Sequence, residues 1–277
     1  MIANLTTVLK YAEEHKCAIG AFNTPTLETI KAVLDNAEEL DVPIIISHAE
    51  CHENEANLDV IGPIMVLMAK NAKIPVCVHL DHGEHIEYIE RALKLGFSSV
   101  MYDGSTLPYE ENVNNTRIVV SLAKQYGASI EAEIGALASR EGGQDNGGAT
   151  YTEPFEAKKF VDDTHIDALA CSFGTAHGIY KSQPKLDFER IKTIRNLTNI
   201  PLVMHGGSGL PHEDYIRAME CGVEKINYYS YMGKAGVNAA LEAINSHKYT
   251  FYHEIAHQAY LGMKEDSLKA MKVFYRK

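Results

Sequence analysis

The feature that most limits what this chain can fold into is a regular alternation of short apolar runs with longer amphipathic stretches. The runs span only a few residues and are bounded by polar or glycine-rich turns. Runs of this kind are typical of strands that are buried on both faces of a parallel sheet. We expect eight such strands: Ala18–Phe22, Pro43–Ser47, Val76–Leu80, Ser99–Tyr102, Ser129–Glu133, Ala168–Phe173, Leu202–Met204 and Lys225–Tyr228.

Helical patterns lie between the runs, for example LETIKAVLDNAEEL, IEYIERALKLG, NVNNTRIVVSLAKQYG and DYIRAMECG. Several of them end in glycine, as the C-termini of helices often do. Strands that each precede a helix predict an α/β fold, and eight of them predict a (β/α)8 TIM barrel. The alternative is a doubly wound open sheet, but AFNTPTLE lacks the glycine-rich turn expected after its first strand. We expect residues 1–277 to form a single barrel domain with an extra C-terminal helical segment.

Charge and composition exclude several functions. The formal net charge of -11 argues against a nucleic-acid partner, because a phosphate backbone requires a basic face. The five cysteines form no C-x-x-C pair and are interpreted as reduced thiols. We find no secretory signal pattern at the amino terminus and no run of the ~18 apolar residues that a membrane span needs. The expectation is a cytoplasmic protein that binds neither nucleic acid nor membrane.

Polar residues gather where the predicted strands end. In a TIM barrel the catalytic groups lie at the carboxyl ends of the strands, so these residues would share one face. Each has a structural interpretation of its own, since a histidine can be a hydrogen-bonded core residue and an aspartate can form a turn. Their number favours a functional site made of Asn23, Asp81, His82, Asp103, Glu133, His177, His205 and Asn227.

Three histidines stand out within this set. His82 lies in VHLDHGEH, His177 in SFGTAHGIY and His205 in LVMHGGSG, after the third, sixth and seventh predicted strands. Each is followed by a glycine, which allows backbone and substrate to approach closely. Three neutral imidazoles leave one or two positions open on Zn²⁺, which is the arrangement of a catalytic zinc site.

The segment HGGSGLPHED predicts a phosphate site. A strand, a glycine-rich turn and a helix start place backbone N–H groups and a helix dipole where they can bind an anion. The preferred phosphate site of TIM barrels is formed by the loops after strands seven and eight, which are HGGSG and NYYS here. A tight turn with a helix cap would be the structural alternative.

Taken in order, AIGAFN, VHLDHG, SSVMYDGS, ENV, EAEIG, GTAHGIY, PLVMHGGSGLP and KIN resemble the class II, zinc-dependent ketose-bisphosphate aldolases, which include fructose- and tagatose-bisphosphate aldolases. The resemblance runs from about residue 1 to residue 260. It implies that His82, His177 and His205 hold one catalytic zinc ion and that Glu133 can contact the metal. It also implies that Asp81 is the acid/base for the aldehyde half and that Glu141 moves the proton on the carbon nucleophile.

The resemblance also indicates how substrate would be bound. Gly178, Gly206, Ser208, Asn227 and Ser230 match phosphate- and substrate-binding positions of the family, often with a monovalent cation, Na⁺ or K⁺. With Asn23, Gly207 and Tyr229 these form the expected binding set. The implied reaction is the reversible cleavage of a ketose phosphate or bisphosphate into dihydroxyacetone phosphate and an aldehyde. A metal would stabilise the carbanion that this cleavage leaves beside the ketone. A homodimer or homotetramer is expected.

Three departures from the family pattern concern the substrate. Tyr229 replaces a small polar residue in Asn227-Tyr228-Tyr229-Ser230, and Ala49 stands where the family has serine after strand two. The loop GALASREGG carries Ala138 and Ser139 in place of the usual glycine pair before its glutamate. We therefore expect aldol chemistry to be retained, with a substrate other than fructose 1,6-bisphosphate.

The sequence also leaves two other functions open. One is a non-catalytic barrel that binds sugar phosphates. The other is a metalloprotease, because His253, Glu254 and His257 spell H-E-x-x-H. The protease interpretation is weak, since Tyr260 replaces the glycine of the extended motif and Glu265 is too close to belong to a separate following helix.

Overall fold

The computed structural model describes residues 1–135, 151–180 and 182–277, and eight parallel strands close into a barrel in chain order. Each strand pairs with the next, and the first pairs with the eighth. This confirms the predicted TIM barrel. The strands are β1 (Ile19–Asn23), β2 (Ile44–Ala49), β3 (Val76–Gly83), β4 (Ser99–Tyr102), β5 (Ser129–Ile134), β6 (Ala168–Cys171), β7 (Leu202–Met204) and β8 (Val223–Tyr228).

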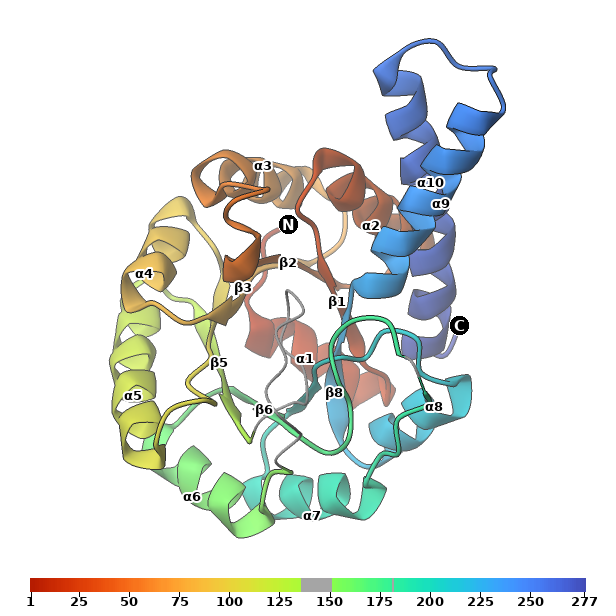
Figure 1. Ribbon diagram of the computed structural model, residues 1–277. Coiled ribbons are helices and arrows are strands. Elements are labelled where there is room, and N and C mark those ends of the chain that lie inside the picture. The colour runs from red at the N-terminus through yellow and green to blue at the C-terminus, as the bar shows by residue number, and fades with distance from the viewer. Residues whose placement is uncertain (136–150, 181) are drawn as a thin grey trace.

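Helices surround the barrel, as Figure 1 shows in a view along its axis. They follow the strands in turn, with one additional helix before β1 and one at the C-terminal end. They are α1 (Leu5–His15), α2 (Leu27–Leu40), the 3-10 turn η1 (Glu50–His52), α3 (Leu58–Asn71), α4 (Ile86–Leu95), α5 (Tyr109–Gln125), α6 (Pro154–Thr164), α7 (Phe188–Thr198), α8 (His212–Glu220), α9 (Ser230–Asn245) and α10 (Tyr252–Phe274).

The structure confirms the predicted bounds of α2 and α4, whereas α5 and α8 begin earlier than predicted, at Tyr109 and His212. Helix α2 spans the predicted Leu27–Leu40, and Thr26 and Thr29 form a reciprocal capping box at its start. Helix α4 ends at Gly96, which adopts φ 97°, a left-handed conformation that glycine accommodates without strain. Local sequence thus determines where these helices begin and end.

Strands β1 and β5 end one residue later than predicted, at Asn23 and Ile134, and β6 ends earlier, at Cys171 instead of Phe173. Strands β2 and β3 run still further toward the carboxyl end of the barrel. β3 continues through Asp81 and His82 to Gly83, and β2 continues to Ala49. Asp81 and His82 are therefore the last residues of a strand rather than the first of a loop. The pairing with β4 shifts register between Leu80 and Gly83, and His82 adopts φ 46°. The irregular end of β3 is where polar side chains were predicted.

Helix α1 covers the amino-terminal end of the barrel. It buries Leu5, Val8, Leu9 and Ala12, and Figure 1 shows it behind the ring of strands. The opposite end, where the strands finish, is therefore the end at which a site can open.

The C-terminal segment forms the predicted extra helical element. Helix α10 packs along α9, and Figure 1 shows the pair extending outward from the barrel before α10 returns beside α2. At that return the N–H of Ala18 donates to the carbonyl of Phe274 over 3.0 Å, and the Tyr275 hydroxyl donates to the Pro43 carbonyl over 2.5 Å. Within the described ranges, no helix is long and apolar enough to cross a membrane.

Candidate metal and catalytic site

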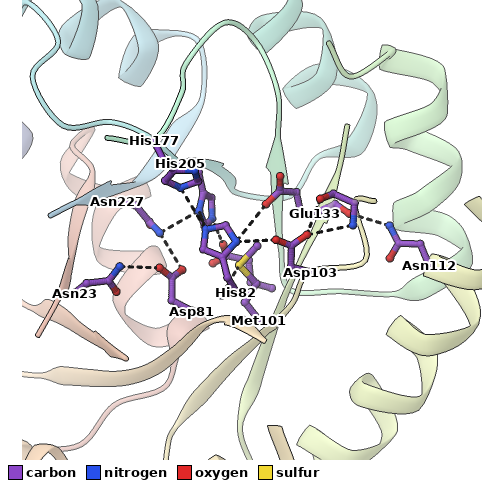
Figure 2. Close-up of polar contacts among 12 residues, drawn as sticks. Asn23, Asp81, His82, Met101, Asp103, Asn112, Glu133, His177, His205 and Asn227 are labelled. Carbon is purple, nitrogen blue, oxygen red and sulfur yellow. Dashed lines mark hydrogen bonds and ion pairs between the residues drawn. The ribbon is translucent and has the colours of Figure 1, made fainter. Parts of the chain in front are cut away.

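The three predicted histidines meet at the carboxyl end of the barrel (Figure 2). His82 Nε2 lies 2.9 Å from His205 Nδ1 and 3.3 Å from His177 Nε2. His82 comes from the end of β3, His205 follows β7 directly, and His177 lies in the loop after β6. Residues that are far apart in sequence thus direct three ring nitrogens toward one point.

Buried carboxylates hold two of these rings from behind. Asp103 Oδ2 lies 2.8 Å from His82 Nδ1, and Glu131 Oε1 lies 2.8 Å from His205 Nε2. An ionised carboxylate only accepts hydrogen bonds, so the ring nitrogen that faces it carries the proton. The opposite nitrogen of each ring faces the other histidines and is the atom that can offer a lone pair to a metal.

This arrangement fits a divalent metal. Zinc bound to three imidazoles at its usual bond length in tetrahedral geometry would separate the nitrogens by about 3.3 Å. The separations of 2.9 and 3.3 Å are close to that value. Metal-ligating histidines characteristically donate their other N–H to a carboxylate, as His82 and His205 are placed to do. The donors therefore suit a zinc ion with an open coordination position.

A second group of donors adjoins the first. His82, Asp103 and Glu133 also offer ligand atoms that lie within 4.8 Å of one another. The Glu133 Oε2 atom is 3.9 Å from His82 Nδ1, and the glutamate is buried at the end of β5. Glu133 is thus near enough to reach a metal after a change of side-chain conformation. The resemblance to the aldolase family implies such a contact.

Asp81 occupies a separate position beside the histidines. The Asn23 and Asn227 side-chain amides each donate to one of its oxygens, over 3.1 and 3.0 Å, and the carboxylate is completely buried. Figure 2 shows Asp81 between these two amides, on the side of the histidines opposite Asp103. The carboxylate is oriented without being one of the grouped metal donors.

The electrostatics of the site favour a cation. Burial alone would lower the pKa of His82, but the charge of Asp81 and the hydrogen bond with Asp103 raise it to about 10. Burial alone would raise the pKa of Asp81, but the nearby histidines and Lys225 lower it. The Asp81 carboxylate therefore remains ionised. Binding a metal would release the proton that the Asp81 charge attracts to His82.

The predicted phosphate-binding residues line a small pocket next to the histidines. Its walls are Asn23, His177, Gly178, Gly206, Ser208, Asn227, Tyr228, Tyr229 and Ser230. Gly206 adopts φ 62°, and a Cβ there would lie 2.5 Å from the Ala176 carbonyl oxygen, so glycine is required. Gly207 adjoins this wall in the same loop, and α9 begins at Ser230. A helix N-terminus next to a glycine-rich turn suits an anion.

Tyr229 lies at the edge of this pocket. Its ring packs against the imidazole of His52, with 5.3 Å between the ring centroids, and its N–H donates to Ser208 Oγ over 2.9 Å. On the neighbouring part of the mouth, Ala49 is paired in register with Asp81. Tyr229 and Ala49, two of the departures from the family pattern, therefore lie at the site itself.

Some functional positions were not predicted from the sequence. Glu131 and the fully buried Lys225 support His205 from within the barrel, and neither belongs to the site that the sequence predicts. One feature of the sequence could have indicated them. Glu131 lies two residues before Glu133 and Lys225 two residues before Asn227, and alternate residues of a strand share one face. Glu141, Ala138 and Ser139 lie outside the described residues.

The H-E-x-x-H segment has a structural role instead. It lies in the first turns of α10, where Glu254 accepts hydrogen bonds from the N–H groups of Thr250 and Phe251, both over 2.9 Å. This is a helix cap. In the part of the chain that the structure describes, the groups able to hold a metal contain neither His253 nor His257.

Comparison with known proteins gives a consistent result. The family model described as "Fructose-bisphosphate aldolase class-II" matches residues 3–277. Fructose-bisphosphate aldolase from Staphylococcus aureus is 35% identical over 271 residues, which is 97% of this chain and 93% of that protein. The YdjI aldolase of Escherichia coli K12 superposes with a TM-score of 0.87 at 32% identity, covering 99% of this chain and 97% of the other. A putative fructose-1,6-biphosphate aldolase from Coccidioides immitis gives 0.87 at 28% identity, covering 98% and 96%.

Proposed function

The chain belongs to the class II fructose-bisphosphate aldolase family, and we propose that it cleaves a ketose phosphate or bisphosphate reversibly into dihydroxyacetone phosphate and an aldehyde. One zinc ion would be held by His82, His177 and His205, with Glu133 as an additional contact. The observation that carries the proposal is the convergence of three ring nitrogens beside a separately oriented carboxylate, Asp81. The expected location is the cytoplasm, and the expected assembly is a homodimer or homotetramer.

The chemistry requires a way to stabilise negative charge and a way to move protons. A bound divalent metal supplies the first by attracting electron density from the ketone of the substrate. In the cleavage direction the carbon–carbon bond breaks and its electron pair stays on the carbon next to the ketone. For this to happen a base must take the proton of the hydroxyl that becomes the aldehyde, because the electrons of that O–H bond form the new C=O bond as the carbon–carbon bond breaks.

Asp81 is the proposed base for this step. Its pKa is lowered despite burial, so the carboxylate is ionised and ready to accept a proton. The amides of Asn23 and Asn227 fix both of its oxygens, which limits the orientations that the carboxylate can adopt. Glu141, which follows β5 in the sequence, is proposed to return a proton to the carbanion.

Substrate phosphate is proposed to bind between the loops after β7 and β8. The groups available there are Ser208, Ser230, the backbone of Gly206 and Gly207, and Gly178 from the loop after β6. A monovalent cation, Na⁺ or K⁺, would complete the charge balance around the phosphate. The phosphate next to the ketone is therefore expected to be required in every substrate.

The rest of the substrate is proposed to differ from fructose 1,6-bisphosphate. Tyr229 fills volume at the edge of the pocket and its phenol cannot reproduce the hydrogen bonds of a carboxylate. Ala49, next to Asp81, provides no polar side-chain atom. A missing polar contact can cost orders of magnitude in specificity. Weak activity on fructose 1,6-bisphosphate is therefore expected, compared with a ketose 1-phosphate that differs in stereochemistry or at its far end.

A coupled cleavage screen across ketose mono- and bisphosphates tests this function. The wild-type protein should release dihydroxyacetone phosphate from at least one of them, and Tyr229→Asp should raise the activity on fructose 1,6-bisphosphate relative to that substrate. Binding of ketose phosphates without cleavage of any of them would favour the non-catalytic barrel. Fructose 1,6-bisphosphate as the best substrate by a wide margin would refute the argument from Tyr229.

A further inference from the structure

A lysine is buried inside the barrel below the histidines. Lys225 lies on β8 with no exposed surface, and its Nζ is 2.8 Å from Glu131 Oε2 and 3.4 Å from His79 Nε2. Barrel interiors are usually filled by branched apolar side chains. A charged pair in this position has lost its hydration, which opposes folding unless the attraction between the charges and their hydrogen bonds compensates for it. A specific function for the pair would explain why it is there.

The pair connects directly to one histidine. The other oxygen of Glu131, Oε1, lies 2.8 Å from His205 Nε2, so a continuous chain of contacts runs from β8 through β5 to the residue after β7. His205 Nδ1, on the far side of the ring, is the atom that faces His82 at 2.9 Å. Glu131 thus determines which ring nitrogen of His205 is left with a lone pair.

Lys225 also fixes the position of Glu131. Because the Lys225 ammonium group donates to Oε2 over 2.8 Å, Oε1 is the oxygen that remains to face His205. The carboxylate accepts from Lys225 and from His205 at the same time, with one oxygen for each.

We infer that Lys225 and Glu131 are positioning residues that fix the orientation of the His205 ring, and with it the nitrogen that faces the metal site, and so set the affinity of the site for its metal. The inference rests on the proposed metal site. It concerns residues that support a ligand from behind, at a distance from any substrate. Outer partners of this kind typically change metal affinity by about 10- to 100-fold when they are removed.

The test is the zinc affinity of the purified protein without substrate, measured by competition with a chelator. Lys225→Met and Glu131→Gln should each weaken zinc binding by about 10- to 100-fold. The visible spectrum of the cobalt-substituted protein should change as well, because the geometry at His205 is altered. Ser99→Ala is the matched control. Ser99 Oγ contacts His79 Nδ1 at 2.8 Å in the same buried layer, and we expect its loss to leave zinc affinity within about threefold of wild type.

The single variants leave one buried charge without its partner and could fail to fold. The double variant Glu131→Leu/Lys225→Met removes both charges together with the oxygen that accepts from His205, and buried apolar side chains in place of a buried ion pair are often tolerated. Zinc affinity at least about tenfold below wild type in the double variant supports the inference. Wild-type zinc affinity in the folded variants would overturn it and leave the pair a purely structural element. A wild-type protein that binds no zinc would instead refute the proposed function, so the two failures are distinguishable.

Discussion

Replacing Asp81 by asparagine should impair catalysis and leave metal binding intact. The substitution keeps the size and shape of the side chain and removes only the ability to take up a proton. Asp81 is fully buried, and both of its oxygens accept from amides, Asn23 at 3.1 Å and Asn227 at 3.0 Å. The new amide group would face an amide donor on one side. One hydrogen bond is therefore lost unless a neighbouring amide turns over.

The expected magnitudes follow from this geometry. One lost buried hydrogen bond costs about 1–3 kcal/mol of folding free energy, and less if Asn227 turns its carbonyl oxygen toward the new amide. Loss of a general base lowers turnover by about 10²–10⁴-fold, which corresponds to roughly 3–5 kcal/mol of activation free energy. The catalytic loss should thus exceed the loss of stability.

Three measurements check this prediction. Zinc content should stay at the wild-type level, the urea unfolding midpoint should fall modestly, and kcat in a coupled cleavage assay should fall by at least about 100-fold. Asp103→Asn is the matched control, because Asp103 contacts His82 at 2.8 Å and should affect metal binding instead. We expect its activity to recover in excess zinc, whereas that of Asp81→Asn should not. A kcat for Asp81→Asn within a few-fold of wild type, or a loss of its zinc, would show that the role was misassigned.

Other predictions concern the metal, the pocket and the C-terminal helix. His177→Ala should lose zinc and cleavage activity whereas His253→Ala keeps both, as metal analysis and the cleavage assay would show; the opposite pattern would revive the protease interpretation. Gly206→Ala should lower activity at least about tenfold and destabilise the fold, because its Cβ would meet the Ala176 oxygen at 2.5 Å. Cleavage activity and a urea unfolding midpoint equal to those of wild type would contradict this. Phe274→Ala should lower the free energy of unfolding in urea by about 3–5 kcal/mol, since the ring is completely buried; a loss below about 1 kcal/mol would contradict its place in the core.

The sequence predicted the barrel well because each strand is buried on both faces and each helix is amphipathic. The three histidines were also found, because each stands near a strand end and is followed by glycine. Glu131 and Lys225 were not found. Charged residues that alternate along a strand have the same pattern whether they face solvent or a closed interior, and only the pairing of β5, β6, β7 and β8 brings these two beside His205.

The sequence could also not predict which ring nitrogen each histidine presents to the site. Whether His82 offers Nε2 or Nδ1 depends on the position of Asp103, which follows a different strand. The extension of β3 through Asp81 and His82 was missed for a related reason. Polar residues usually indicate the end of a buried strand, but here they face the mouth of the barrel and the backbone pairing continues beneath them.

The return of α10 to the barrel has a consequence for how the protein is made. Phe274 and Tyr275 complete the surroundings of β1 through hydrogen bonds to Ala18 and Gly20, and Phe274 packs near Phe22 with 6.4 Å between the ring centroids. At typical rates of protein synthesis, β1 leaves the ribosome roughly 10–50 s before these partners exist. During that interval the apolar side of β1 that packs on α10 stays uncovered, so we expect the nascent chain to depend on chaperones until synthesis reaches the end of α10.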